Sequence, residues 1–429
     1  MKNIDLLTLG DELLLGLREN GHLNFLGAEL SRHGLPLRRN LVVRDEPGEI
    51  EAAFRDAWNS ADLVITTGGL GPTSDDNTRE AIARVLGLPL EFDPEAEAAI
   101  RERFARLQRP LHERDRKQCF RPRGMELLRN RFGTAPGIYY RTDQKILVML
   151  PGPAGELRPM FESEVLPKLR AAGWLSAEES YVQLRTAGVG ESLVEERIRP
   201  VIGQHPGVGL AFCAHQGMVD VRISSGEREF TREALKNIAK ELREVLGEDF
   251  VCCGLHPLAK VVLEELRGRE ATLAVAESCT GGLLSNAFTD IPGASKTFLG
   301  GVVSYTNACK MQLLDVPEEI LLQHGAVSAE AAVAMVTGVA ERLGADYALS
   351  VTGFAGPGGG TEKTPVGTIF LGYSSPVGAW ARKVTYPAAD RLTVKARAVT
   401  TALDWMRRKL LRYKVEDFLA ADYGAEVAK

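Results

Sequence analysis

The chain has 429 residues and a formal net charge of −5, from 52 Lys and Arg against 57 Asp and Glu. At roughly 100–200 residues per domain, this length predicts about two to four domains. The composition, 45% hydrophobic and 25% charged, is typical of globular proteins and excludes the disordered, collagen-like and coiled-coil classes. No apolar run approaches the roughly 18 residues of a membrane-spanning helix. The first ten residues contain Asp5 and indicate a strand rather than a signal peptide.

The six cysteines show no CxxC motif and no zinc-type spacing, and the one close pair is adjacent. This pattern indicates reduced, mostly structural thiols in a cytoplasmic protein. The cysteines are Cys119, Cys213, Cys252, Cys253, Cys279 and Cys309.

Residues 1–170 alternate strand-like apolar runs with helical periodicity. This alternation predicts a mainly parallel sheet with helices on both faces, which is a three-layer α/β domain. Ligands of such a sheet bind at the carboxyl ends of its strands. The predicted strands are Ile4–Leu9, Leu41–Val43, Leu63–Thr67 and Ile146–Leu150, and the predicted helices are Glu49–Trp58 and Thr78–Leu86.

Two further segments complete the predicted organisation. Residues 171–252 follow a β-α-β-β-α-β order, which is the split βαβ (KH-like) plan of a small linker or dimerisation domain. Residues 253–415 form a second α/β domain, with predicted helices at Leu258–Leu266, Ala329–Leu343 and Leu392–Leu411. The last residues, 416–429, are expected to be a frayed tail.

A glycine-rich loop in the first domain follows one strand and opens the next helix. Its sequence is Thr67-Gly-Gly-Leu-Gly-Pro-Thr-Ser-Asp-Asp-Asn-Thr-Arg79. Gly68, Gly69 and Gly71 let the backbone approach an anion, and the helix start favours phosphate. Asp75 and Asp76 suit a divalent cation that bridges to phosphate oxygens. The alternative is that one of them caps the helix.

The stretch 101–131 is basic, with eleven Lys or Arg against four Asp or Glu. This charge suits a phosphate-rich ligand. A solvated helix face is the favoured interpretation, because Ile100, Phe104, Leu107 and Leu111 keep an amphipathic stripe beneath the charges.

The last domain carries a second loop of the same kind, Ala276-Glu-Ser-Cys-Thr-Gly-Gly-Leu283. The hydroxyls of Ser278 and Thr280 and the amides of Gly281 and Gly282 are candidate phosphate donors. A merely capped helix is the alternative for this motif taken alone.

The glycine-rich loop of the first domain resembles the signature of the molybdopterin-binding fold as found in the CinA (competence/damage-inducible protein A) family. Agreeing blocks are Gly10-Asp-Glu-Leu-Leu14, Arg116-Lys-Gln118, Gly133-Thr-Ala-Pro-Gly137, Leu150-Pro-Gly-Pro153 and Arg158-Pro-Met160. The resemblance implies a metal-dependent ADP-ribose pyrophosphatase, with Mg²⁺, Mn²⁺ or Co²⁺ held by Asp75, Asp76 and Glu156. It places Gly68, Gly69, Gly71, Thr73 and Lys117 against the nucleotide.

One block departs from the family pattern. The chain has Asn20-Gly21-His22 where the family usually shows Asp-Thr-Asn, so a carboxylate is missing there. His22 is either a replacement ligand or an ordinary surface histidine.

The last domain resembles the nicotinamide-nucleotide amidase (nicotinamide mononucleotide deamidase) domain of the same family over residues 258–411. The matching blocks are residues 276–283, 290–295, 300–310, 325–328, 350–357, 365–368 and 390–391. The resemblance implies Ser295 as nucleophile, activated by Tyr305 and Lys310, without a metal. It implies substrate contacts from Ser278, Thr280, Gly281, Gly282, Gly353 and Arg391. The alternative for Arg391 is an ordinary surface residue at a helix start.

The residue types fit this amide chemistry. A Ser-His-Asp triad has little support, because only His324 of the seven histidines lies near these motifs, and a Ser with a Lys base is a known alternative. Lys310 acts as a base if it is desolvated or lies near the substrate's pyridinium ring. Cys279, at a helix start that favours thiolates, is a rival nucleophile.

The sequence therefore predicts a cytoplasmic homodimer acting on the small molecules nicotinamide mononucleotide and ADP-ribose, with no membrane association and no nucleic-acid partner. The competing hypothesis is non-enzymatic. Under it, the first domain binds a nucleotide, a pterin or nucleic acid during competence or repair.

Overall fold

A computed structural model describes residues 2–175, 180–225, 230–387 and 389–412. The chain divides into two compact units, residues 1–180 and residues 181–429, and each is described by itself. The predicted tail, 416–429, lies outside the described residues.

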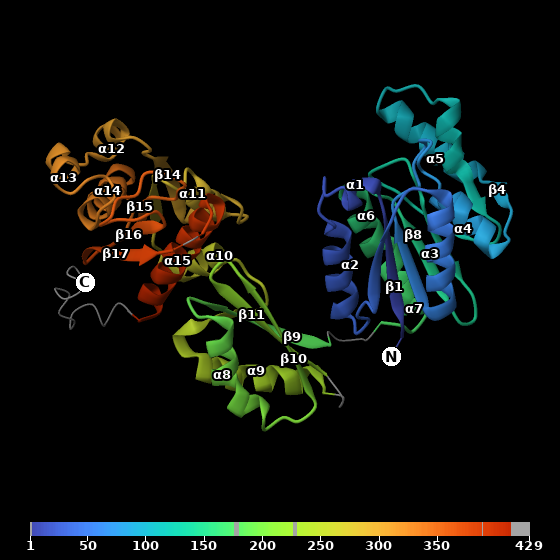
Figure 1. The fold of residues 1–429 in the computed structure, drawn as a ribbon, viewed down its shortest axis with the longest axis horizontal. Coiled ribbons are helices and arrows are strands. Elements are labelled where there is room, and N and C mark those ends of the chain that lie inside the picture. The colour runs from blue at the N-terminus through green and yellow to red at the C-terminus, as the bar shows by residue number, and fades with distance from the viewer. Residues whose placement is uncertain (1, 176–179, 226–229, 388, 413–429) are drawn as a thin grey trace. The chain divides into compact units, whose positions relative to one another are not determined.

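The first unit contains a six-stranded sheet of order β2-β1-β3-β8-β7-β6 (Figure 1). The strands β1, β2, β3 and β8 are parallel, which confirms the prediction, whereas β7 and β6 add an antiparallel edge that the sequence did not indicate. The bounds are β1 Ile4–Leu9, β2 Arg39–Val43, β3 Leu63–Thr67, β6 Glu126–Leu128, β7 Gly137–Arg141 and β8 Ile146–Leu150.

Helices cover both faces of this sheet, as expected from the buried strands. Apolar residues of α2 and α6 pack on one face, and those of α3 and α4 pack on the other (Figure 1). The helices are α1 Asp11–Leu14, α2 Gly21–Arg32, α3 Pro47–Ser60, α4 Thr78–Leu86, α5 Pro94–Arg106, α6 Ala154–Met160 and α7 Leu166–Ala171, with the 3₁₀ helix η1 at Glu113–Cys119 and the π-helical turn η2 at Phe161–Val165. A short antiparallel pair, β4 Leu90–Phe92 and β5 Phe120–Pro122, stands apart from the sheet.

The basic stretch is only partly helical, which corrects the predicted amphipathic helix. Asp93 caps α5 by accepting from the amides of Glu95 and Ala96. The helix then ends at Arg106, so Leu111 lies beyond it. Ile100 is buried, with Phe104 and Leu111 packed around it.

The middle module, at the start of the second unit, has the predicted β-α-β-β-α-β order. Its sheet is β10-β11-β9-β12, and the apolar faces of α8 and α9 pack on one side of it. The bounds are β9 Tyr181–Ala187, α8 Glu191–Ile202, β10 Val208–His215, β11 Met218–Ser225, α9 Arg232–Leu246 and β12 Phe250–Cys253, with η3 at Gly247–Asp249.

The last domain contains a five-stranded sheet of order β14-β13-β15-β16-β17, with β13, β14 and β15 parallel. The helices α10, α11 and α15 pack on one face, and α12, α13 and α14 pack on the other. The strands are β13 Leu273–Glu277, β14 Phe298–Val303, β15 Tyr347–Gly353, β16 Thr368–Ser375 and β17 Gly378–Thr385. The helices are α10 Leu258–Arg267, α11 Leu283–Thr289, α12 Asn307–Leu314, α13 Glu318–Gln323, α14 Ala329–Leu343 and α15 Arg391–Arg412, with η4 at Ala294–Lys296.

Polar contacts join the middle module to α15. The buried Arg407 guanidinium donates to the carbonyls of Glu248 and Phe250, and Arg408 donates to the carbonyl of Ala187. The far end of α15 is therefore held by the middle module.

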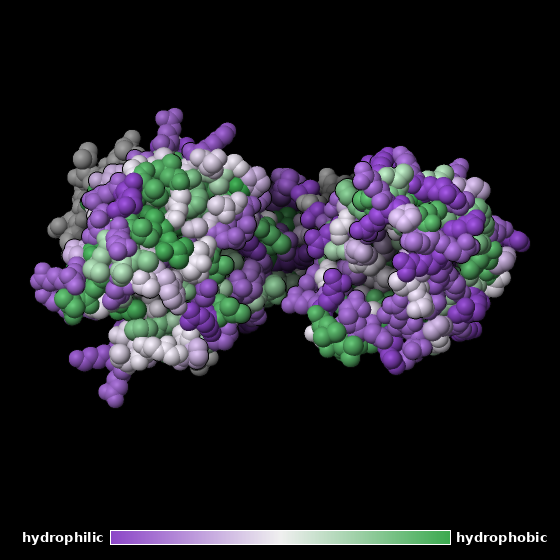
Figure 2. Space-filling view, turned by 90° about the horizontal axis from the view of Figure 1, so that it is seen from above, coloured by the Kyte–Doolittle hydropathy of each residue, from purple (hydrophilic) through white to green (hydrophobic). Residues whose placement is uncertain are grey.

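The visible face in Figure 2 is mostly hydrophilic, with separate apolar areas. Within the described ranges, no helix has both the length and the apolar character needed to cross a membrane.

Candidate active site

Three parallel strands of the last domain end at one edge of the sheet. The register pairs Glu277 of β13 with Val303 of β14 and with Val351 of β15. Residues that follow these strands must therefore meet at this edge, as is usual for ligand sites of parallel sheets. Ser278 follows β13 directly, and α12, which carries Lys310, follows β14.

Ser278 and Lys310 are in contact at this edge. The Lys310 ammonium nitrogen, Nζ, lies 3.0 Å from the Ser278 hydroxyl oxygen and 2.8 Å from the carbonyl oxygen of Ser304. Lys310 is 1% exposed, and Ser278 is 8% exposed. The chain thus brings a serine hydroxyl and a buried amine into hydrogen-bond distance.

The surroundings of Lys310 suit a base. Burial lowers its pKa, because a charged amine loses hydration inside the protein. Within the described ranges its side chain has no carboxylate partner that would favour the charged form. A neutral amine 3.0 Å from a hydroxyl can accept the hydroxyl proton.

The surroundings of the rival nucleophile, Cys279, do not favour the reactive thiolate form. Burial raises the pKa of its thiol to about 12, so the thiol stays protonated at neutral pH. The neighbouring Thr280 is fully buried, and its hydroxyl has no partner among the described residues. Thr280 therefore offers a donor or acceptor beside Ser278.

The backbone amides at the start of helix α11 donate to a carboxylate of the protein itself. The buried carboxylate of Glu277 accepts from the amides of Gly282, Leu284 and Ser285, and from the Ser285 hydroxyl. This corrects the prediction that the Gly281 and Gly282 amides hold a phosphate. The Gly282 amide already serves a carboxylate, and the Gly281 amide donates to the carbonyl of Ser278.

Basic side chains of α15 lie over the same loop. Arg391 donates to the carbonyl of Gly356 and lies 3.3 Å from the Tyr305 hydroxyl. One turn later, the Lys395 ammonium lies 3.8 Å from the position that a Cβ atom on Gly281 would occupy. Arg391 and Lys395 thus form a cationic pair near Ser278.

Ser295 does not join this site, which corrects the predicted nucleophile. It lies in η4, before β14 begins, whereas Lys310 lies after β14 ends. A strand of six residues spans roughly 20 Å, so the two side chains lie at opposite ends of it. Tyr305 is 60% exposed and contacts Arg391, so its predicted role as an activator of Ser295 is also wrong.

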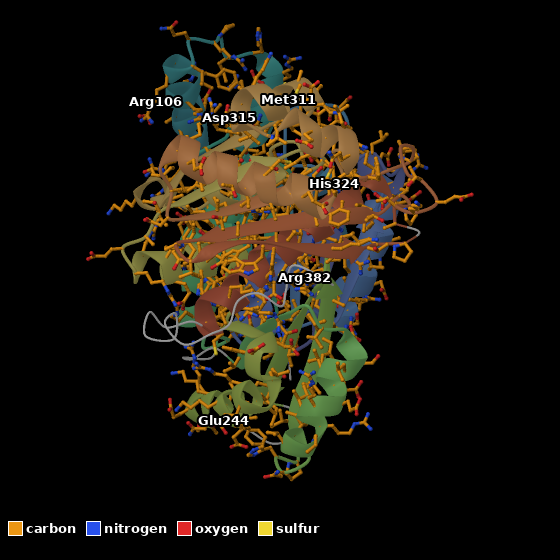
Figure 3. All side chains as sticks on the ribbon, turned by 90° about the vertical axis from the view of Figure 1, so that its left-hand side faces the viewer. Arg106, Glu244, Met311, Asp315, His324 and Arg382 are labelled. Atoms are coloured by element: carbon orange, nitrogen blue, oxygen red, sulfur yellow. The ribbon has the colours of Figure 1, made fainter. Side chains whose placement is uncertain are left out.

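Two other predicted features have a structural role. A Cβ atom on Gly353 would lie 2.7 Å from the carbonyl oxygen of Thr368, so this glycine allows β15 and β16 to pack closely. His324 lies at the end of α13, where it faces Glu330, and it is labelled in Figure 3.

In the first unit, the glycine-rich loop forms as expected. Gly68 and Gly69 have φ values of +98° and +68°, which residues other than glycine rarely adopt. A Cβ atom on Gly68 would lie 2.7 Å from the carbonyl oxygen of Leu9. The glycines therefore allow the chain to turn tightly from β3 into α4.

The carboxylates predicted to bind a cation are not brought together. Asp76 accepts from the amide and the hydroxyl of Thr73, so it closes its own loop. Glu156 accepts from the amide nitrogen of Asn130. Asp75 is exposed, and a hydrogen bond from Thr73 lowers its pKa. Throughout the described part of the chain, no three His, Cys, Asp or Glu side chains are positioned to hold a metal ion, so these residues do not fit the predicted cation.

Two other predicted residues lie near this loop. The Lys117 ammonium donates to the carbonyl oxygens of Asp76 and Thr73, so it ties the loop to η1. His22 lies 3.0 Å from the Thr67 hydroxyl, and burial lowers its pKa. Asn20 takes the capping role at α2, where its side chain accepts from the Leu23 amide.

Sequence reasoning missed Glu277 and Lys395 and gave Ser278 a secondary role. A signal for Glu277 existed, because an acidic residue at the start of a helix satisfies free amides. Lys395 lies four residues after Arg391, on the same helix face, which is also readable from spacing.

Three family models match the chain in order. The model described as "Probable molybdopterin binding domain" matches residues 5–171, "Damage-inducible protein CinA KH domain" matches 183–251, and "CinA C-terminal domain" matches 255–410. A CinA-like protein of Desulfovibrio desulfuricans is 41% identical over 418 residues, which are 96% of this chain and 97% of that protein.

A second relative and one solved structure are also similar to this chain. A CinA-like protein of Kosmotoga olearia is 39% identical over 410 residues, which are 95% of this chain and 98% of that protein. A crystal structure of a competence-damaged protein (CinA) superfamily protein from Klebsiella pneumoniae is 33% identical, with a TM-score of 0.35, and covers 36% of this chain and 97% of that chain.

Proposed function

This chain belongs to the CinA family, and from that premise we propose that its last domain is an amidase that hydrolyses nicotinamide mononucleotide to nicotinate mononucleotide and ammonia. The observation that carries the proposal is the 3.0 Å contact between the Ser278 hydroxyl and the buried Lys310 amine. Serine with a lysine base is a known arrangement for acyl transfer.

In the first half of the reaction, Lys310 accepts the Ser278 proton while the hydroxyl oxygen attacks the carboxamide carbon. The protonated lysine then gives this proton to the amide nitrogen, and ammonia leaves as the carbon–nitrogen bond breaks. The product of this half is an ester between Ser278 and the nicotinoyl group. The unpartnered Thr280 hydroxyl is a candidate donor to the carbonyl oxygen, where negative charge develops.

In the second half, the neutral Lys310 amine accepts a proton from water, and the water oxygen attacks the ester carbon. The ester bond breaks, Ser278 regains a proton from Lys310, and the carboxylate product is free to leave. Both halves use the same base, so a single buried lysine is sufficient.

Substrate phosphate is recognised by Arg391 and Lys395 in this proposal. The Gly282, Leu284 and Ser285 amides at the start of α11 are engaged by Glu277, so the proposed phosphate donors are these two cations, of which Lys395 lies beside Gly281. Arginine and lysine both bind phosphate, and arginine does so through two parallel hydrogen bonds.

The test is ammonia release from nicotinamide mononucleotide by the purified full-length chain. Ser278→Ala is expected to remove almost all activity, and Ser295→Ala is the matched control, expected to retain most of it. An inactive Ser295→Ala enzyme with an active Ser278→Ala enzyme would show that Ser278 is not the nucleophile.

For the first unit we propose cleavage of a nucleoside diphosphate sugar such as ADP-ribose, supported by the tight glycine turn before α4. The predicted ligands do not fit a cation, so no step is assigned to one. The test is cleavage of ADP-ribose by the full-length chain, with and without chelator. A wild-type chain that leaves ADP-ribose intact in the presence of Mg²⁺, Mn²⁺ and Co²⁺ would contradict the proposal.

A further inference from the structure

A groove of the first unit lies between helix α5, strand β6 and residues 129–136. Its cavity volume is about 1210 Å³, which is larger than the roughly 300–1,000 Å³ of typical small-molecule pockets. We call it the arginine groove, because Arg103, Arg106, Arg121, Arg129 and Arg131 line it. Figure 3 labels Arg106, which belongs to the last turn of α5.

The acidic residues of the groove are mostly paired already. Asp93 binds Arg121, Glu102 binds Arg106, and Glu126 binds Lys168. In contrast, Arg103, Arg129 and Arg131 have no carboxylate partner within the described ranges. The charge that remains available to a ligand is therefore positive.

One of these arginines, Arg103, has a buried side-chain nitrogen without a hydrogen-bond partner in the described part of the chain. Arg103 donates to the carbonyls of Arg131 and Phe132, whereas its Nε is buried without a partner among the described residues. A buried guanidinium nitrogen without a partner costs free energy unless a ligand or a water molecule satisfies it.

The loop that forms one wall is held in place. The Asn130 side chain accepts from the amides of Phe132 and Gly133, and it donates to the Ala135 carbonyl and the Glu156 carboxylate. This network fixes the backbone between Arg129 and Arg131 before a ligand arrives, which reduces the entropy lost on binding.

The groove also has apolar lining residues. These include the small side chains of Ala96 and Ala99 on α5, together with Met125 and Leu127. Small residues leave room for a planar ring, and methionine adapts to aromatic groups.

We propose that the arginine groove binds a nucleotide with two or more phosphates, at a site separate from the glycine-rich loop 68–77. The base lies against the alanine and methionine lining, and the phosphates lie at the guanidinium groups of Arg129, Arg131 and Arg103. This site goes beyond the proposed hydrolysis of ADP-ribose, and it does not depend on that activity.

The test uses ADP as the probe, with the full-length chain and isothermal titration calorimetry at low salt. Arg129→Glu/Arg131→Glu is expected to weaken ADP binding at least tenfold, because two charge-assisted contacts are lost. Arg109→Glu/Arg114→Glu makes the same charge change at exposed positions of the basic stretch that do not line the groove. This control is expected to change the dissociation constant less than twofold.

Hydrogen exchange of the wild-type chain provides an independent readout. Added ADP is expected to protect the amides of residues 129–135. Equal weakening in both double variants would overturn the proposal, because it would show a diffuse electrostatic attraction. Protection confined to residues 68–77 would overturn it, as would tripolyphosphate or a single-stranded oligonucleotide binding more tightly than ADP.

Discussion

The two glycine-containing loops, residues 67–79 and residues 276–283, have the same local plan and different chemistry. Each follows a buried parallel strand and opens a helix. In the first, the Asp76 carboxylate turns back on Thr73 of its own loop. In the second, Glu277 satisfies the helix start, and the next residue, Ser278, contacts Lys310 from a different element.

The lysines beside the two loops show the same contrast. Lys117 donates to carbonyl oxygens of the first loop and holds it to η1. Lys310 is buried against a hydroxyl, and burial lowers its pKa. The strand, the glycine turn and the helix are common to both loops. The second loop additionally has a buried base from another segment, Lys310, in contact with a hydroxyl.

The largest expected effect separates these two lysines. Lys310→Met is expected to lower the deamidation rate by about 10²–10⁴-fold, the usual loss for a removed general base. Lys117→Met is the matched variant beside the other loop and should leave deamidation unchanged. Similar losses in both variants, measured as ammonia release, would contradict the difference drawn between the loops.

The pH dependence of deamidation tests whether Lys310 acts as a neutral base. Lys310 is active when neutral, so kcat/KM for deamidation should rise with pH as the lysine loses its proton. Because burial lowers its pKa, the rise should be centred below the ordinary lysine value of about 10.4. A profile that falls through this range would show that the charged amine is the active form.

The β14 strand explains why the site was only partly predictable. The continuous apolar runs Ile4–Leu9 and Leu63–Thr67 identify their strands with correct bounds. In contrast, Phe298–Val303 contains two glycines, which have low strand propensity, so the bounds of the strand before Tyr305 were not predicted. Without these bounds, nothing in the sequence shows that Ser295 and Lys310 lie at opposite strand ends, or that Ser278, 32 residues before Lys310, is the contacting hydroxyl.

The next effect concerns the buried carboxylate of the second loop. Glu277→Gln is expected to lower the free energy of unfolding by about 2–3 kcal/mol, because a Gln amide group would face backbone donors that now bind a charged oxygen. The measurement is the urea midpoint of the second unit. Glu318→Gln, at an exposed helix start, is the control and should shift it little. Equal shifts of the urea midpoint in the two variants would show that the Glu277 carboxylate does not stabilise the start of α11.

A smaller effect is expected at the cationic pair of α15. Lys395→Ala should raise KM for nicotinamide mononucleotide about tenfold, the factor for roughly 1.4 kcal/mol of lost phosphate binding, with a smaller change in kcat. Nicotinamide riboside, which lacks the phosphate, should show no such difference between the two enzymes. A fall in kcat at unchanged KM would instead place Lys395 in the chemical step.

The smallest effect tests the first loop. Asp76→Asn should lower the free energy of unfolding of the first unit by about 0.5–1 kcal/mol, since the amide keeps one acceptor for Thr73 but loses the charge. Ser74→Ala, on an exposed residue of the same loop, is the control. Both variants should retain nucleotide binding by calorimetry, because Asp76 closes the loop rather than contacting a ligand. Loss of binding in Asp76→Asn at unchanged stability would give this carboxylate a direct role at the site, and the contrast between the two loops would then be wrong.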